Sequence, residues 1–345
     1  MKKVISLILS VVMIASLLTA CGSPEPAATV ATVAPSETAA PAEDTPDAAG
    51  SYTVAIVQQL DHSSLDEIRT ALEAELKALG AENNIDITIQ TFNGQNDATM
   101  LSQIGTQVVS DNVDMIIPIA TLAATYMYTA AEGTDIPIVY AAISDPEGAG
   151  LTGLPTVTGV SDALNTPFIL DMMFAADPDI QTVGLLYSNS EVNSAAPIAE
   201  AKAYLDAKGI AYLEKTGNTS GEIISAASDL VGRVDAVFTP TDNVVMATEA
   251  AVAEILNEAG IPHYTGADSF VTAGAFATCG VNYTELGTRT ADIAFDILLG
   301  GEIGEFQIMD GGIITVNSET AEAIGIDYSV FSEMANTVIE VVTAE

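Results

Sequence analysis

Short apolar runs alternate with amphipathic stretches of helical length from Ser51 onward. Strands of a buried parallel sheet are apolar on both faces, whereas the helices that cover them are apolar on one face. In the first half the predicted strands are 53–59, 86–93, 115–120 and 136–143, and the predicted helices are 64–80 and 98–110. Strands that are followed by helices in this way predict a parallel sheet with helices on both faces.

The same alternation restarts after residue 166. The predicted helices are 167–177, 194–208, 222–231 and 243–260, and the predicted strands are 182–188, 210–217, 236–241 and 261–266. A chain of 345 residues is long enough for two domains. Two such runs, joined near 158–166, predict an α/β fold of two Rossmann-like lobes with parallel sheets and a ligand cleft between them.

The last part of the chain adds a strand in "AFATCGV", a helix over 283–299 and a further run, "IITVNSETAEAIGI". We expect this tail to cross back to the first lobe and then to return to the second. The first lobe would then comprise 51–161 plus about 282–315, and the second 162–281 plus about 316–345.

Small polar residues follow almost every predicted strand, as in "LLYSNSEVNS" at 185–194. Taken singly, such residues are ordinary helix caps and turn formers. In open parallel sheets, however, ligands bind outside the carboxyl ends of the strands, and helix N-termini there favour an anionic group. Asp242 and Asp268 would suit a cationic group, so the predicted ligand carries both a carboxylate and an ammonium, as an amino acid does.

Residues for catalysis are scarce. The chain has two histidines, of which His263 lies inside a predicted strand, where a packing role is expected, and His62 follows the first strand. His62 is predicted to line the cleft as a neutral hydrogen-bonding group or a stacking surface. The motifs CxxC, HExxH, GxxxxGK[ST] and GxSxG are all absent from the sequence. We therefore predict no enzyme activity, no cofactor and no metal site.

The N-terminus is typical of a secreted lipoprotein. Lys2 and Lys3 precede an apolar run, and the sequence Leu18-Thr19-Ala20-Cys21 resembles a bacterial lipobox. Residues 1–20 are therefore predicted to be a signal peptide, with a lipid on Cys21. An ordinary signal peptide or a membrane anchor are the alternatives, although the run is short for a bilayer span. Residues 21–50, rich in Pro, Ala, Thr and Ser, are predicted to form a disordered tether.

This reading places a soluble domain at the outer face of the bacterial cell membrane, attached through the lipid alone. Cys279 is the only other cysteine, so no disulfide within the chain is expected once Cys21 is lipidated, and a buried position is predicted for it. The chain has 9 Lys and Arg against 47 Asp and Glu, a net charge of −38. Such a surface repels nucleic acid and anionic lipid headgroups, so no nucleic-acid partner is expected.

Several longer stretches resemble a known family. They are "HSSLDEIRTAL" (62–72), "AAISDPEGAGL" (141–151), "TGVSD" (158–162), "VGLLYSNSEVNS" (183–194), "PTDN" (240–243) and "GADSFVTAGAFATCGVNYTELGTRTADIAFDILLGG" (266–301). The chain resembles the substrate-binding lipoproteins of ABC importers, in particular those that bind tryptophan or tyrosine. The resemblance extends from about Tyr52 to Ile326.

The resemblance implies a type I periplasmic-binding-protein fold, closure of two lobes on a small ligand, and delivery to an ABC permease with its ATPase. It also implies a set of cleft residues, with Asp242 as the residue that holds the ammonium. These residues are Thr121, Ser144, Asp145, Ser188, Asn193, Asp242 and Asp268.

The chain departs from that family in places. Leu122 follows Thr121 where relatives often have Pro, and the sequence has no Trp and only 6% aromatic residues. A sugar ligand is less favoured, because sugars usually stack on aromatic faces. The candidate walls for an aromatic ligand are Phe92, Phe168, Phe270 and His62, although core packing is the favoured interpretation of each, because buried aromatic residues are common. A sensor lipoprotein with a membrane signalling partner, a receptor for a nucleoside or a sugar, and an extracellular enzyme remain alternatives.

Overall fold

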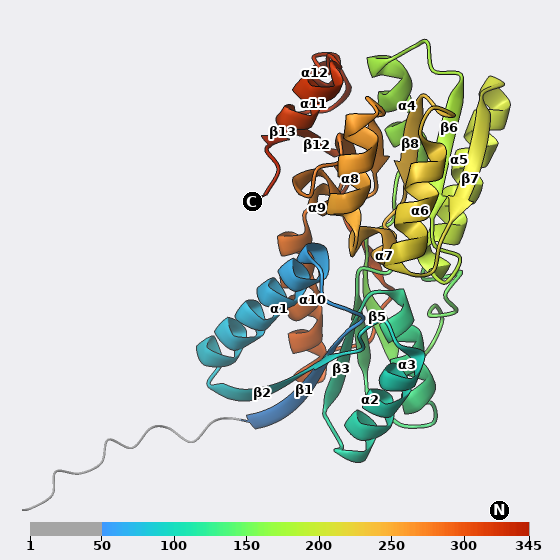
Figure 1. The fold of residues 1–345 in the computed structure, drawn as a ribbon. Helices are drawn as coiled ribbons and strands as arrows, with labels where there is room; N and C mark the ends of the chain where they lie inside the picture. Colours follow the sequence, from blue (N-terminus) through green and yellow to red (C-terminus); the bar gives the residue numbers. More distant parts are fainter. Residues whose placement is uncertain (1–49, 345) are drawn as a thin grey trace, which may run out of the picture. The chain divides into compact units, whose positions relative to one another are not determined.

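Residues 50–344 are described by the computed structural model; the predicted signal peptide, Cys21 and the tether up to residue 49 lie outside the described residues. The described chain forms two sheets flanked by helices (Figure 1). This confirms the predicted α/β fold with two parallel-dominated sheets. Among the described residues, none of the helices combines the length and the apolar character needed to cross a membrane.

The first sheet has the strand order β11-β5-β4-β3-β1-β2, and every neighbouring pair is parallel. Its strands are Gly50–Gln58 (β1), Ile85–Asn93 (β2), Met115–Ile119 (β3), Ile138–Ala141 (β4), Val157–Ser161 (β5) and Gln307–Ile308 (β11). Its helices are Ser63–Glu82 (α1), Ala98–Ser110 (α2), Thr121–Ala131 (α3) and Tyr283–Leu298 (α10).

Alternate residues of β1 enter different cores. Val54 and Ile56 pack in the core beneath α1 and α10, whereas Ala55 and Val57 pack in the core beneath α2 and α3. All four are completely buried. The strand is apolar on both faces because the helix pairs cover both faces of the sheet, as Figure 1 shows for α1 with α10 and for α2 with α3.

The second sheet has the order β13-β12-β10-β9-β8-β6-β7. Its strands are Thr182–Tyr187 (β6), Ala211–Thr216 (β7), Ala236–Thr239 (β8), His263–Thr265 (β9), Ala277–Gly280 (β10), Ile313–Asn317 (β12) and Thr337–Val341 (β13). The pair β10–β12 is antiparallel, which is an exception to the predicted parallel pairing.

The helices of the second lobe include two short ones at strand ends. They are Thr166–Ala176 (α4), the 3₁₀ turn Val192–Ser194 (η1), Ala195–Lys208 (α5), Ser220–Leu230 (α6), Asn243–Met246 (α7), Glu249–Glu258 (α8), Asp268–Thr272 (α9), Ser318–Ile324 (α11) and Phe331–Met334 (α12). The single helix predicted over 243–260 is wrong in one respect, because it is divided into α7 and α8 at residues 247–248.

The chain passes between the sheets three times, at 162–165, at 281–282 and at 309–312. The third passage ends at Ile313, slightly before the expected boundary near residue 315. The first passage, at 162–165, lies within the predicted junction near 158–166, but 157–161 forms the buried strand β5, which was not among the predicted strands. Gly159 lets β5 pair with β4: a Cβ there would lie 2.2 Å from the carbonyl oxygen of Tyr140. The Gly and Thr in this strand obscure its apolar pattern in the sequence.

Candidate functional site

Loops at the carboxyl ends of strands from both sheets line a small cavity. The first lobe contributes residues after β3 and β4, and the second contributes residues after β6, β8 and β9. The residues that line it are His62, Ser64, Leu65, Ala120, Thr121, Ala142, Ser144, Asp162, Asn193, Thr241, Asp242, Asn243, Met246, Ala267, Phe270 and Tyr283. The cavity volume is about 20 Å³, which is room for about one water molecule.

The N-terminal ends of five helices meet at this cavity. Its lining includes the N-cap or the first residues of α1, α3, α7, α9 and α10. Of these, α1, α3 and α10 belong to the first lobe and have 20, 11 and 16 residues. Free N–H groups and the helix dipole make such ends favourable positions for an anion.

Two alanines of the lining adopt a left-handed backbone. Ala120 has φ of 75° at the end of β3, and Ala142 has φ of 57° directly after β4. This conformation costs an alanine on the order of 1 kcal/mol. It is held by sheet hydrogen bonds, from Ala120 N to the carbonyl of Ala141 and from Ala142 N to the carbonyl of Val160. Backbone strain of this kind gathers at functional sites, and here it shapes two adjacent strand ends of one cavity.

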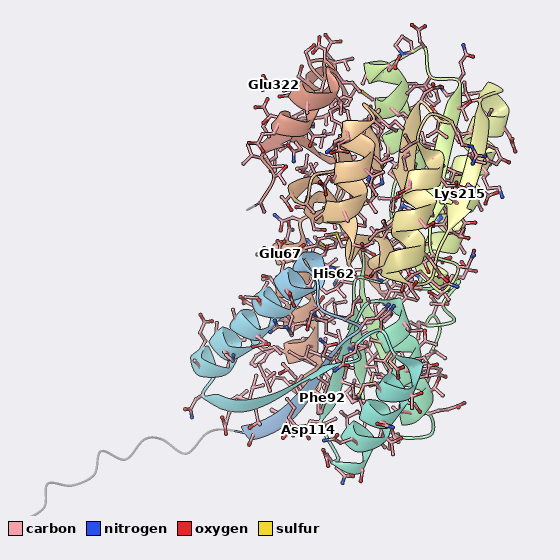
Figure 2. The ribbon with its side chains drawn as sticks, viewed as in Figure 1. His62, Glu67, Phe92, Asp114, Lys215 and Glu322 are labelled. Carbon is pink, nitrogen blue, oxygen red and sulfur yellow. The ribbon has the colours of Figure 1, made fainter. Side chains whose placement is uncertain are left out.

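Polar side chains join the two lobes around the cavity. Ser144 Oγ lies 3.0 Å from Thr241 Oγ1, and the hydroxyls of Ser64 and Ser269 are also hydrogen-bonded. His62 Nε2 lies 3.0 Å from Asn243 Oδ1; Figure 2 shows His62 at the start of α1, where the lobes meet. The structure is therefore that of a closed pair of lobes.

Asp162 lies at the first passage between the lobes and is almost completely buried. Its Oδ1 accepts a hydrogen bond from Ser144 Oγ (2.9 Å), and its Oδ2 accepts one from the hydroxyl of Tyr283 (3.2 Å). Burial raises the pKa of this carboxyl, and the two hydroxyl donors oppose that rise. Each oxygen keeps acceptor capacity, since a carboxylate has about four acceptor sites. A cation in the cavity would compensate the burial of this charge.

Asp242, in contrast, is occupied by the protein itself. Its Oδ1 accepts hydrogen bonds from the backbone N–H groups of Val244 and Val245. Its Oδ2 accepts one from Ser188 N and one from Ser194 Oγ, and both of these bonds are 2.7 Å long. Four donors fill the four acceptor sites of the carboxylate. In this structure Asp242 caps α7 and ties the loop after β6 to it, so the predicted contact with a ligand's ammonium would require one of these donors to move away.

Two polar atoms in the lining have no partner in the structure. They are His62 Nδ1 and Thr121 Oγ1, and both are buried. Leu65, Met246 and Phe270 supply an apolar part of the same wall. A few unpaired polar groups beside an apolar wall are typical of a small-molecule site.

The structure brings five of the eight predicted ligand-binding residues to the cavity: His62, Thr121, Ser144, Asn193 and Asp242. The other three lie outside its lining. Asp145 accepts from Gly148 N in a turn, and Ser188 Oγ bonds within the second lobe to Ser190 and Asn218. Asp268 starts α9, where burial, followed by the charge of Glu67, raises its pKa to about 6.

Of the predicted aromatic walls, Phe270 lines the cavity, whereas Phe92 and Phe168 pack at the edges of the two hydrophobic cores. The sequence reasoning did not select Asp162, Thr241, Asn243 or Tyr283. Asp162, Thr241 and Asn243 stand in the motifs "TGVSD" and "PTDN", so these motifs contained the signal.

The second histidine forms a sealed array within the second lobe. His263 Nδ1 lies 2.9 Å from Glu249 Oε1, and its Nε2 lies 2.8 Å from Thr239 Oγ1. An acid, a histidine and a hydroxyl in this order resemble the relay of a hydrolase. Since the side chains of Glu249 and His263 and the whole of Thr239 are completely buried, no substrate reaches them. The predicted packing role of His263 agrees with this burial.

Comparisons with known proteins show the family of the chain. Residues 53–338 match the family model of the ABC transporter substrate binding proteins. The chain belongs to this family. It is 30% identical over 330 residues to a tyrosine-binding protein of Clostridioides difficile (strain R20291), which covers 94% of this chain and 92% of that protein.

Two solved structures of this kind differ in whether a ligand is bound. An ABC domain in complex with L-Trp from Streptococcus pneumoniae superposes with a TM-score of 0.77 at 27% identity, over 84% of this chain and 99% of that one. The ligand-free, open structure of a substrate binding protein with adhesive properties from Clostridium difficile gives 0.64 at 32% identity, over 85% and 100%. The higher score belongs to the complex despite its lower identity, in agreement with the closed lobes seen here.

Proposed function

We propose that the protein is the extracytoplasmic binding component of an ABC importer and that it binds a zwitterionic amino acid, in particular an aromatic one. The observation that carries this proposal is the lining of the cavity between the lobes. Helix N-termini of the first lobe provide a place for a carboxylate, and Asp162 provides a buried acceptor for an ammonium. The protein binds and releases its ligand without changing it.

The two charged ends of the ligand would be recognised separately. Its carboxylate would lie against the N-terminus of α3, where unpaired Thr121 Oγ1 adds a donor. Its ammonium would bind Asp162, which Ser144 and Tyr283 hold in place. An ammonium there would offset the burial of the Asp162 carboxylate, so each charge would gain a partner.

The preference for an aromatic side chain rests on two supports. Leu65, Met246 and Phe270 form an apolar part of the lining, and the relatives include a tyrosine-binding protein and a domain in complex with L-Trp.

Ligand entry requires the lobes to move apart, because the closed cavity of about 20 Å³ cannot hold an amino acid. A ligand that touches both lobes favours the closed state, and the permease would receive the closed complex. Cys21 would bear the lipid, and residues 22–49 would tether the domain to the outer face of the membrane.

Asp162 gives the sharpest test of this function. We expect calorimetric titration of ligand-free protein to show binding of Tyr, Trp or Phe, with at least about a 10-fold loss of affinity in Asp162→Asn, because a hydrogen bond to a charged group contributes about 1.5–3 kcal/mol. Asp145→Asn is the matched control, since Asp145 lies in a turn outside the cavity, and should bind as the unaltered protein does. Undiminished affinity in Asp162→Asn would remove Asp162 from the site, and a failure to bind any amino acid would overturn the proposed function.

A further inference from the structure

A chain of side-chain hydrogen bonds leads from the backbone of α3 across the lobes to His62. It begins at Leu122 N, a backbone donor whose direction is fixed, which bonds to Gln59 Oε1 at 3.1 Å. An amide whose oxygen meets this donor must direct its nitrogen the other way. Gln59 Nε2 accordingly donates to Glu191 Oε1 at 2.8 Å and to Asn96 Oδ1 at 2.9 Å.

Glu191 is the link between the lobes in this chain. It stands in the loop after β6 of the second lobe and is 5% exposed. Its Oε1 accepts from Gln59 of the first lobe, and its Oε2 accepts from Asn243 Nδ2 at 2.6 Å. Both of these contacts are donations to the carboxyl group, so Glu191 directs the nitrogen of the Asn243 amide toward itself.

The orientation of Asn243 then fixes the tautomer of His62. With Nδ2 turned to Glu191, Asn243 offers Oδ1, an acceptor, to His62 Nε2 at 3.0 Å. His62 Nε2 must therefore carry the proton in a neutral ring, which leaves Nδ1 as an acceptor. Nδ1 is the buried atom without a partner in the cavity lining.

The tautomer assigned to His62 requires a neutral ring, and the surroundings of the ring favour the neutral form. Burial lowers the pKa of its imidazole, an effect larger than the opposing influences of Asn243, Asp66 and Asp61. The ring is therefore neutral at physiological pH and keeps one lone pair, on Nδ1.

Building on the proposed function, we propose that His62 determines specificity by accepting, at Nδ1, a hydrogen bond from a donor on the ligand's side chain, such as a phenol hydroxyl or an indole N–H. Glu191 is the positioning residue that orients His62 through Asn243. Because Glu191 contacts both lobes, the tautomer of His62 that makes Nδ1 an acceptor is fixed only when the lobes close. A ligand of the same shape without the donor would leave Nδ1 unpaired in a buried site, and such sites reject analogues that lack the group.

The tautomer is measurable without any ligand, because the chain has only two histidines. Long-range ¹H–¹⁵N NMR on the chain without residues 1–20, labelled with ¹⁵N-histidine, distinguishes protonated from unprotonated ring nitrogens, and His62→Phe assigns the signals. We expect His62 to show a protonated Nε2 and an unprotonated Nδ1, and Glu191→Gln to show a mixture of tautomers. A protonated Nδ1 in the unaltered protein would overturn the proposal.

Matched ligands test the consequence for specificity. Tyr should bind at least ten-fold more tightly than Phe, or Trp at least ten-fold more tightly than 1-methyl-Trp, and His62→Phe should abolish the difference. Glu191→Gln should lower the affinity for Tyr or Trp by a larger factor than the affinity for Phe or 1-methyl-Trp, a result that a merely structural role would not give. Equal affinities within both pairs would overturn the proposal. If no amino acid binds at all, the proposed function fails, and the tautomer alone then decides whether His62 offers an acceptor.

Discussion

The two histidines of the chain stand in similar hydrogen-bonded arrays but in different surroundings. His62 is linked through Asn243 to Glu191 of the opposite lobe; the residue lines the cavity, and its Nδ1 has no partner. His263 is bonded to Glu249 and Thr239 within a single lobe, and both of its nitrogens have partners. A histidine between a carboxyl and a hydroxyl is thus not by itself a sign of a site.

The two arrays differ in the position of the buried polar atom that has no hydrogen-bond partner. At His263 the unpartnered atom is Glu249 Oε2, enclosed in the lobe, whereas at His62 it is a ring nitrogen in the lining of a cavity. The first array stabilises one lobe whether or not the lobes meet. The second is complete only when they meet, so it can respond to a ligand.

The largest expected effect is that of His263→Ala on stability. Removing the imidazole leaves the completely buried Glu249 without its partner, and breaking a buried pair costs about 3–5 kcal/mol. Unfolding in urea measures this loss. The double variant His263→Phe with Glu249→Leu should recover most of it, and ligand affinity of the folded single variant should stay unchanged. A large loss of affinity would mean that the two arrays are not separate.

Glu191→Gln should change how stability depends on pH. Burial, followed by the charge of Asp242, raises the pKa of Glu191 from 4.5 to about 7. Since the folded pKa is the higher one, the associated stability is fully present below about pH 4.5 and is lost as the pH rises through about 7. This amounts to about 3 kcal/mol, which the variant should remove from the pH profile.

Urea unfolding between pH 4.5 and 8 tests this slope. Glu322→Gln, an exposed acid on α11 (Figure 2), is the control and should keep the slope of the unaltered protein. Identical slopes in Glu191→Gln and the unaltered protein would show that Glu191 is charged in the folded protein as readily as in the unfolded one.

Asp242→Ala should lower the free energy of unfolding by about 2 kcal/mol, because a buried cap is removed and four donors lose their acceptor. Asp97→Ala, which removes an exposed cap with one bond to Met100 N, should cost about 1 kcal/mol. Ligand affinity of folded Asp242→Ala should fall less than that of Asp162→Asn. The reverse order would restore Asp242 as the acceptor for the ammonium.

The smallest effect is expected for Ser144→Ala, which removes the hydroxyl between Thr241 and Asp162. The loss of one such bond between the lobes, about 1 kcal/mol, should shift the open–closed equilibrium about five-fold toward the open form. Small-angle scattering without ligand would show a larger radius of gyration. Ser228→Ala, whose hydroxyl bonds only within α6, should leave the radius unchanged.

The sequence by itself determined the two α/β lobes and the polar strand ends, because these depend on periodicity and composition over short windows. The apolar runs predicted β1 and the strands beside it, and "SNSEVNS" and "PTDN" marked loops that reach the cavity. The strand β5, however, was not predicted. Its Gly159 interrupts the apolar pattern, and the need for Gly becomes clear only from the close approach to Tyr140 on the neighbouring strand.

Only the tertiary structure decided which acids and which histidine are free to meet a ligand. Asp242 and Asp162 both stand in polar loops after strands. Ser188 and Ser194, some 50 residues away, donate to the remaining acceptor sites of Asp242, whereas the carboxylate of Asp162 keeps acceptor capacity. Gln59 and Glu191 are 132 residues apart and meet only when the lobes close. Whether a polar group is paired depends on partners brought from distant parts of the chain, and a local pattern does not contain them.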